Sequence, residues 1–466
     1  MQDKMVRTRI APSPTGYPHI GTIYQALFNF AFAKRKNGKF LIRIEDTDRT
    51  RFVEGAEDVI YQAIDWFGLT ENESPRKDGE FGPYRQSERL EIYHKYAQEL
   101  IDKNRAYFAY YPKQDAGQKK DYTQKVSQDK KETTQEPPKT IVEMIQRGDW
   151  IVRMRVPADK NVIVHDEIRG EVVFTPDQVT EQVLIKSDGF PTYHLASTVD
   201  DHLMKITHVV RGEEWISSAP KHVLLYQYFD WDVPKFYHTP TLRNPDKSKL
   251  SKRHGHTNVQ WFQEEGYLPE AILNFLALMG WTHPKEKEIF SLEEFIEVFD
   301  LKDIRQVGPI FDLTKLTWMN GEYIRGISVG QLTKLLHRFN IEFGEDQKAF
   351  EKIDNEKFNK IVELAQSRIE TLKQFYPLAK HFLPVSTFVI SDETKEVAKS
   401  LQIEFQNIKN WSKEEILEAL RVVLKKHSIR MPVLYTIITG EERGLPLPES
   451  LEILGREETL SRLNAS

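Results

Sequence analysis

The sequence predicts an α/β protein in which a parallel-sheet domain, interrupted by a small α+β insertion, precedes an all-helical C-terminal region. Three observations lead to this fold class. The chain starts with a strand–helix–strand pattern, alternating apolar runs return between residues 150 and 185, and after Trp281 apolar residues recur almost throughout at the three- and four-residue spacing of helices. A strand, a helix and a second strand imply a parallel pair of strands.

The first part of the chain alternates between strands and helices. Apolar residues Ile20, Ile23 and Leu27 recur at helical spacing, and basic residues precede Gly38, which is typical of a helix C-terminus. We expect a strand at 6–10, a Pro- and Gly-rich loop at 12–18, this helix from 20 to Gly38 and a second strand at 40–44. Two more helices are expected at 52–67 and from Ser87 onwards.

The next part predicts the insertion. Residues 112–140 are rich in Lys, Gln, Asp and Thr, and we interpret them as a solvated excursion or a partly disordered insertion. Short alternating runs follow and indicate strands at 150–156, 162–164, 172–174 and 183–185. A strand end at Val209–Arg211, a helix at 217–228 and helical periodicity at 290–299, 329–339, 358–375 and 416–424 complete the pattern.

Composition narrows the class of protein. The 466 residues suffice for about three domains, and 39% hydrophobic with 29% charged residues is ordinary for a globular chain. The absence of cysteine excludes disulfides, thiolate zinc sites, iron–sulfur clusters and a cysteine nucleophile. Net charge is −5, so a nucleic-acid partner would need local basic patches. The N-terminal residues lack a signal-peptide pattern and the apolar stretch 271–281 is too short to span a bilayer, so we expect a cytoplasmic protein without membrane contact.

Two segments are candidate phosphate sites, although neither a G-x-G nor a P-loop motif occurs. Residues 12–22 join the first strand to the first helix, where ligands bind open α/β sheets and where free N–H groups favour anions. His19 would donate to phosphate oxygens and Gly21 would admit close backbone approach; alternatively, the segment is only a turn and a helix cap. Residues 247–255 carry four cations and predict a loop that closes over a triphosphate, or else a solvated basic loop or nucleic-acid patch.

Together these segments resemble the paired signatures of class I aminoacyl-tRNA synthetases. Longer stretches resemble bacterial glutamyl-tRNA synthetase, namely RIAPSPTG at 9–16, RIEDTD at 43–48, YRQSER at 84–89, FPTYHLA at 190–196 and RGEEW at 211–215. The resemblance implies a Rossmann-like catalytic domain at 1–102 and 185–236, an acceptor-binding insertion at 103–184, a stem-contact region with the KLSKR loop at 237–325, and a helical anticodon-binding region at 326–466.

The resemblance also implies the reaction. Glutamate and ATP, with Mg²⁺, would form glutamyl-adenylate, and the glutamyl group would pass to the 3′ end of tRNA(Glu). A non-discriminating enzyme that also charges tRNA(Gln), a glutaminyl-tRNA synthetase, and an RNA-binding or regulatory paralogue without catalysis are the alternatives. A monomer is expected.

Site residues follow from the matching motifs. The matching motifs imply catalytic roles for His19 and Lys252. Glutamate would be held by Arg9, Ala11, Ser13, Glu45, Tyr193, Ser197 and Arg211. ATP would contact His19, Gly21, Thr22, Glu214, Trp215, Lys249, Leu250 and Lys252, and the tRNA acceptor end would contact Asp48 and Arg51. The chemistry agrees, because a buried carboxylate requires permanently charged donors such as Arg. Structural alternatives are an Arg9–Glu45 ion pair and a core position for Tyr193.

The chain departs from the family pattern at a few positions. Thr22 stands where the general class I signature has a second His, Leu250 and Arg253 differ from the generic loop signature, and Ser197 stands where the family has Asn. Some relatives carry a Cys-rich zinc knob near residues 105–111. This segment is aromatic here, so we expect neither a metal site nor structural zinc.

Overall fold

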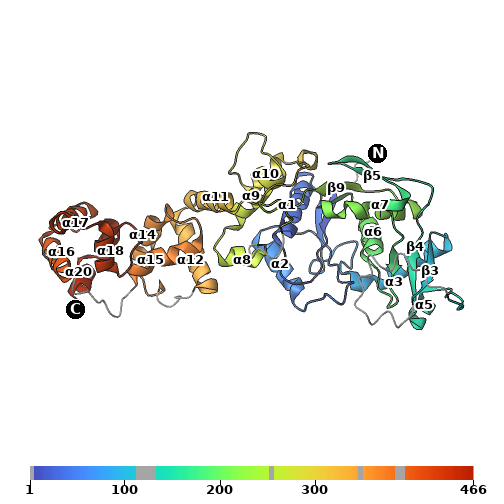
Figure 1. Cartoon of the computed structure of the whole chain (residues 1–466), viewed down its shortest axis with the longest axis horizontal. Coiled ribbons are helices and arrows are strands. Elements are labelled where there is room, and N and C mark those ends of the chain that lie inside the picture. Colours follow the sequence, from blue (N-terminus) through green and yellow to red (C-terminus); the bar gives the residue numbers. More distant parts are fainter. Residues whose placement is uncertain (1–4, 112–132, 251–256, 345–349, 384–393, 465–466) are drawn as a thin grey trace. The chain divides into compact units, whose positions relative to one another are not determined.

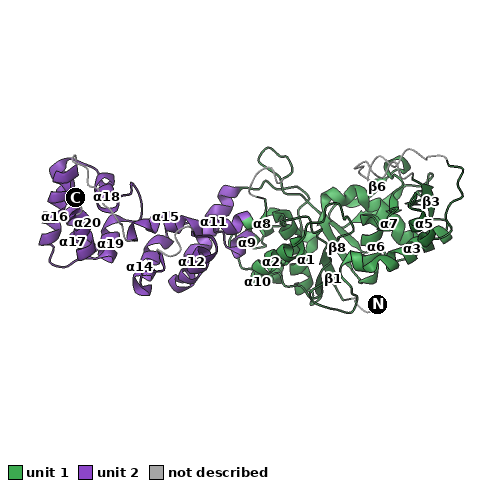
Figure 2. Ribbon diagram, turned by 90° about the horizontal axis from the view of Figure 1, so that it is seen from below, with its two compact units in different colours: residues 1–260, 273–312 green, residues 261–272, 313–466 purple. Residues whose placement is uncertain are grey.

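The computed structural model describes residues 5–111, 133–250, 257–344, 350–383 and 394–464. The chain divides into two compact units. Unit 1 consists of residues 1–260 and 273–312, and unit 2 of residues 261–272 and 313–466 (Figure 2). Most of the polar segment 112–140, for which we expected a solvated excursion, lies outside the described residues.

The expected strand–helix–strand start is confirmed. Strand β1 (Arg7–Ile10) pairs in parallel with β2 (Lys39–Ile42), and helix α1 (Ile20–Arg35), labelled in Figure 1, connects them. Most of α1 is buried, and its last turn carries Lys34 and Arg35. The expected helices follow as α2 (Ala56–Trp66) and, after a short 3₁₀ turn at Gln86–Arg89, α3 (Leu90–Asp102).

A second, four-stranded sheet has the order β6-β5-β9-β8. Strands β8 (His208–Gly212) and β9 (Lys235–Thr239) are parallel, and α7 (Ala219–Tyr228) joins them. Strands β5 (Val162–Asp166) and β6 (Gly170–Phe174) form a hairpin, and β5 lies parallel to β9. Two strands that we expected within the insertion therefore share a sheet with β8 and β9.

A third sheet is antiparallel and contains the other strands expected in the insertion. Its order is β3-β4-β7, formed by Ala106–Tyr110, Trp150–Met154 and Val183–Ile185, with α5 (Ile141–Arg147) preceding β4. Helix α6 (Tyr193–Leu203) follows β7. Helices α8 (Val259–Glu264) and α9 (Pro269–Gly280) each contain residues of both units, and α10 (Leu292–Val298) belongs to unit 1.

All regular elements described in unit 2 are helical. Besides parts of α8 and α9 and two short 3₁₀ turns, they are α11 (Leu313–Gly326), α12 (Val329–Phe343), α14 (Asn355–Gln366), α15 (Phe375–Ala379), α16 (Lys395–Asn407), α17 (Lys413–His427), α18 (Met431–Thr439), α19 (Leu447–Leu454) and α20 (Arg456–Asn464). The expectation of one helical stretch over 358–375 is wrong. Helix α14 ends at Gln366 and a 3₁₀ turn at Leu372–Gln374 precedes α15. In this break the backbone N–H of Leu372 donates to the Gly266 carbonyl at 2.9 Å.

The short segment 261–272 is part of the core of unit 2. Leu268 is buried in the same apolar cluster as the helices of the C-terminal region. Its backbone N–H donates to Oδ1 of Asn320 at 2.8 Å, and the Tyr267 hydroxyl lies 2.7 Å from that of Thr317. Unit 2 is therefore assembled from two separate stretches of chain.

One buried carboxylate connects β1, β2 and the loop after α2. Glu73 receives two hydrogen bonds from Arg7, at 2.8 and 2.7 Å, one from Lys39 at 2.7 Å and one from the Tyr84 hydroxyl at 2.5 Å. Burial alone would raise the pKa of Glu73, but these donors outweigh it and lower the pKa to about 2. The resulting stabilisation is complete above the pKa of the unfolded chain and is lost as pH falls towards 2.

Among the described residues, we find no helix that is both long and apolar enough to cross a membrane.

We predict that Glu73→Ala lowers the free energy of opening of unit 1 by about 3–5 kcal/mol, because it leaves the buried Arg7 without its carboxylate. Hydrogen exchange of peptides covering β1 and β2 measures this local opening. The control is Glu99→Ala, which removes a half-exposed pair with Lys103 and should cost less than about 1 kcal/mol. Equal effects of the two substitutions would contradict the prediction.

Candidate active site

Several sequence-predicted site residues of unit 1 lie in loops that follow the carboxyl ends of its parallel strands. The loop that holds Ala11 and Ser13 follows β1, Glu45 follows β2, and Glu214 follows β8. The backbone N–H of Glu45 donates to the Pro12 carbonyl at 3.0 Å, which ties the two loops together. Such an edge is where open α/β sheets bind ligands.

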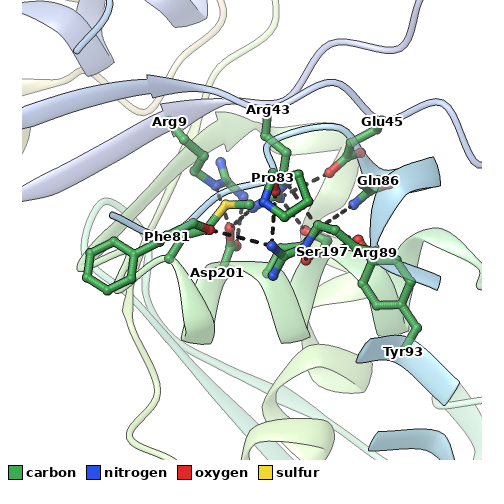
Figure 3. A network of polar contacts seen from close by, with 12 residues as sticks. Arg9, Arg43, Glu45, Phe81, Pro83, Gln86, Arg89, Tyr93, Ser197 and Asp201 are labelled. Atoms are coloured by element: carbon green, nitrogen blue, oxygen red, sulfur yellow. Dashed lines mark hydrogen bonds and ion pairs between the residues drawn. The ribbon is translucent and has the colours of Figure 1, made fainter. Parts of the chain in front are cut away.

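Arg9 belongs to a buried network of ion pairs (Figure 3). Its Nε and Nη2 donate to the two carboxylate oxygens of Asp201, each at 3.0 Å. Arg43 donates to the same carboxylate at 2.6 Å and to Glu45 at 3.0 Å. The structural alternative of an Arg9–Glu45 pair is therefore wrong: Asp201 is the partner of Arg9, and Arg43 is the partner of Glu45.

The electrostatics of this network differ between its two acids. Burial raises the pKa of Glu45 to about 7, against the opposing effect of Arg43. Burial also acts to raise the pKa of Asp201, but Arg9 and Arg43 together lower it below its usual value. Asp201 is therefore a fixed anion between two arginines, whereas Glu45 can exchange a proton near neutral pH.

Ser197 joins the same network from helix α6. Its hydroxyl accepts a hydrogen bond from Nη2 of Arg43 at 3.3 Å, and its side chain is buried. Tyr193 lies one helical turn earlier, so both side chains extend from the same face of α6. The residue that departs from the family pattern thus contacts the arginine that orients Glu45.

Arg211 has a different environment. Its Nε donates to Nε2 of His238 at 3.0 Å, and its Nη1 lies 3.1 Å from both the Tyr193 hydroxyl and Nδ1 of His222. Burial, reinforced by the charge of Arg211, holds the pKa of His222 well below its usual value, so this ring is neutral. The Nη2 of Arg211 is buried without a hydrogen-bond partner in the described structure.

Tyr193 lies between the two arginine environments. Its ring packs against Trp215 with the ring centroids 4.4 Å apart, and its hydroxyl contacts Arg211. It is also within electrostatic reach of Arg9. Tyr193 is thus more than a core aromatic, because its polar end faces the charged groups.

The candidate phosphate segment forms the start of α1. His19 is the N-cap, and its Nδ1 accepts from the backbone N–H of Gly21 at 2.9 Å. The backbone N–H of Thr22 donates to the His19 carbonyl at 2.8 Å. The neutral ring therefore carries its proton on Nε2. A Cβ at Gly21 would come within 3.0 Å of His19 Nδ1, so the position leaves little room for a larger residue.

The second phosphate segment is described only in part. Nζ of Lys249 lies 3.0 Å from a carboxylate oxygen of Glu214, and both side chains are exposed. Leu250 is buried, and its backbone N–H donates to the Leu242 carbonyl at 2.9 Å. Lys252, the second predicted catalytic residue, lies outside the described residues.

The remaining predicted residues lie on the surface or in the loop after β1. Ser13 is exposed, and its carbonyl accepts from the Thr15 N–H at 2.9 Å. Asp48 and Arg51 form an exposed ion pair of 2.6 Å. Slight burial acts to raise the pKa of Asp48, but hydrogen bonds from Thr50 and Arg51 lower it. Exposed pairs of this kind contribute little to stability.

A metal site is not found among the described residues, since no three His, Asp or Glu side chains there could jointly hold an ion. The aromatic segment near residues 105–111 forms strand β3. The absence of structural zinc stays a prediction.

Several residues of the site were missed by sequence reasoning. Asp201, Arg43, His222 and His238 are all buried and directly contact predicted site residues. Two of these residues could have been predicted, because Arg43 lies inside the quoted RIEDTD motif and Asp201 follows another acid, Asp200. Nothing in the sequence indicated the two histidines.

Comparison with known proteins shows the family to which the chain is similar. Residues 5–318 match the family model for the catalytic domain of class I tRNA synthetases (E and Q), and residues 331–466 match an anticodon binding domain. A glutamate–tRNA ligase of Thermus thermophilus is 42% identical over 472 residues, covering 98% of this chain and 99% of that protein. The enzyme of the same name from a Marinomonas species is 41% identical over 480 residues, covering 99% and 95%.

Solved structures give the same result. A crystal structure of a glutamate tRNA ligase from Elizabethkingia meningosepticum, in complex with its amino acid, superimposes with a TM-score of 0.82 at 33% identity and covers 99% of both chains. The resemblance drawn from the sequence motifs is confirmed at the level of the whole chain. With both family models matched and relatives aligned over nearly its full length, the chain belongs to the class I tRNA synthetases of the E and Q group.

Proposed function

We propose that the chain ligates L-glutamate to the 3′ end of tRNA(Glu) in an ATP-dependent reaction. Full-length relatives with this name support the proposal. Glutamate's α-carboxylate attacks the α-phosphate of ATP, and pyrophosphate leaves with Mg²⁺. The terminal ribose hydroxyl of the tRNA then attacks the mixed anhydride. Catalysis rests on positioning and charge stabilisation, without a covalent enzyme intermediate.

The observation that carries the proposal is the unmatched charge of Arg211. Its polar partners are a tyrosine hydroxyl and two histidines, and no hydrogen bond to its buried Nη2 is found among the described residues. A buried guanidinium in this state favours a carboxylate, because a charge-assisted hydrogen bond satisfies both groups. A glutamine amide offers an oxygen but no charge.

The other glutamate contacts lie around Tyr193. In this proposal Arg9 joins Arg211 in holding glutamate, while Ser13, Glu45 and the backbone of Ala11 meet the α-ammonium. Ser197 acts indirectly, through the hydrogen bond that its hydroxyl accepts from Arg43.

The ATP site is proposed at the start of α1. His19, Gly21 and Thr22 form the helix N-terminus that attracts phosphate, and the Nε2 proton of His19 is a donor to developing negative charge. Glu214, Trp215, Lys249 and Leu250 would contact the nucleotide from the other side, and Lys252 would neutralise the departing pyrophosphate.

The tRNA contacts are proposed by region. Residues 103–184 would bind the acceptor end with help from Asp48 and Arg51, residues 237–325 would contact the stem, and residues 326–466 would bind the anticodon. The match of 331–466 to an anticodon binding domain supports the last assignment. We propose that the enzyme acts as a cytoplasmic monomer.

Aminoacylation assays with glutamate and glutamine against purified tRNA(Glu) and tRNA(Gln) test the function. We expect glutamyl-tRNA(Glu) as the product. Glutamate on both tRNAs would establish the non-discriminating form, and glutamine on tRNA(Gln) would establish a glutaminyl enzyme. Failure to form any aminoacyl-tRNA would contradict the proposal and favour a paralogue without catalysis.

We predict that Arg211→Ala lowers kcat/KM for glutamate by at least about ten- to a hundred-fold, because it removes the charged partner of the substrate carboxylate. The KM for ATP should remain nearly unchanged. Arg85→Ala is the control, since it removes partly exposed pairs with Glu57 and Glu88 and should leave both values unchanged. If Arg211→Ala lowers the melting temperature but keeps a normal kcat/KM for glutamate, Arg211 is only a structural residue.

His19→Asn separates the two roles of His19. Asparagine is a good N-cap, so the melting temperature should stay close to that of the wild type. Loss of the donor to developing charge should reduce kcat by roughly ten- to a thousand-fold. Single-turnover rates of adenylate formation provide the measurement. A wild-type rate in this variant would restrict His19 to helix capping.

A further inference from the structure

A row of three side chains crosses three neighbouring strands and ends at Arg211. Strands β5, β9 and β8 lie side by side and parallel in the four-stranded sheet. Asp166 ends β5, His238 lies near the end of β9, and Arg211 lies near the end of β8, in register with His238. All three side chains are buried.

The carboxylate of Asp166 is held by four donors. One oxygen accepts from the backbone N–H of His238 at 3.0 Å and from its Nδ1 at 2.6 Å. The other accepts from the backbone N–H groups of Ile168 at 3.1 Å and Arg169 at 2.9 Å. With both oxygens occupied, the carboxylate has one orientation and can only accept. It therefore fixes the imidazole of His238.

This contact determines the tautomer of His238. Because Nδ1 donates to Asp166, the neutral ring has its lone pair on Nε2, which accepts from Nε of Arg211 at 3.0 Å. Burial lowers the pKa of His238, and the charge of Arg211 adds to this against the opposing effect of Asp166. A protonated ring, or the other tautomer, would direct an N–H at the N–H of Arg211.

A neutral ring holds the guanidinium without neutralising it. Arg9 is paired directly with the carboxylate of Asp201, and an incoming acid would have to compete with that pair. Between Arg211 and Asp166, in contrast, lies the imidazole of His238. The Nε edge of Arg211 is thus anchored, while its Nη2 has no hydrogen-bond partner in the part of the chain that the structure describes.

We propose that His238, oriented by Asp166, is a positioning residue that fixes the guanidinium plane of Arg211 so that Nη2 meets the side-chain carboxylate of the substrate. The proposal rests on the proposed glutamate-ligating function. It adds residues of strands β5 and β9 to the site. It also makes the preference for glutamate over glutamine depend on Asp166 and His238, although neither side chain is placed against the substrate.

Two variants of His238 separate its two hydrogen bonds. In His238→Asn, the amide can donate to Asp166 from the place of Nδ1 but offers nothing in the place of Nε2. In His238→Gln, the longer amide can place its oxygen where Nε2 was and accept from Arg211. We expect His238→Asn to raise the KM for glutamate roughly ten- to a hundred-fold, with the KM for ATP unchanged. In His238→Gln, the increase in log KM for glutamate should be at most half as large as in His238→Asn.

Selectivity provides a second measurement. The ratio of kcat/KM for glutamate to that for glutamine should fall in His238→Asn and be largely restored in His238→Gln. The controls are His165→Asn and His165→Gln, on the same strand as Asp166 but with a side chain 74% exposed, and they should leave every value unchanged. If His238→Asn does not fold, Asp166→Asn tests the same contact. The NH₂ group of the new amide would point at one of the four N–H groups that donate to the Asp166 carboxylate.

The outcomes distinguish this inference from the function on which it rests. A wild-type enzyme that does not charge tRNA with glutamate would overturn the proposed function. An active wild type whose two His238 variants raise the KM values for glutamate and ATP equally, or lose stability without a change in glutamate use, would overturn the positioning role alone. A glutamate-specific loss in His238→Asn with recovery in His238→Gln supports it.

Discussion

The structure of unit 1 depends on the ion pairs that buried arginines form with carboxylates at the carboxyl ends of its strands. A guanidinium removed from water needs acceptors, and the chain supplies them from helix α6, where Asp201 receives Arg9 and Arg43 together. Because Arg9 lies in β1 and Arg43 directly follows β2, the single carboxylate ties two strands to a helix that is 192 and 158 positions away in sequence. The loops that would receive substrate start directly after these anchored positions.

The arginines of the site differ in what balances their charge. Arg9 and Arg43 have carboxylate partners, which makes them part of a closed network. Arg211 has neutral partners, and the nearest acid in its row, Asp166, acts through an imidazole. In our proposal both Arg9 and Arg211 contact glutamate, but only Arg211 lacks a carboxylate partner among the described residues and can pair with the substrate's carboxylate without competition. Local charge balance, rather than burial, separates the two.

Sequence patterns predicted the parts of this structure that depend on neighbours in the chain. The first strand–helix–strand unit, the strand end at Arg211 and the helical nature of unit 2 all follow from periodicity and local signals. The partners of the arginines could not be predicted in this way. Asp201 and Asp166 meet their partners across 192 and 72 positions, and no spacing rule indicates which acid meets which base. For the same reason, the joining of β5 to β9 was not foreseen.

The division of unit 2 into two stretches of chain affects how the protein can be dissected. The first family match ends at residue 318 and the second begins at residue 331, so a C-terminal fragment could be designed to begin between them. Such a fragment would lack residues 261–272, and with them the buried Leu268 and the backbone contact between Gly266 and Leu372. Its apolar core would be left open on one side. A C-terminal fragment with a complete apolar core would therefore need residues 261–272 as well, joined to it for example by circular permutation.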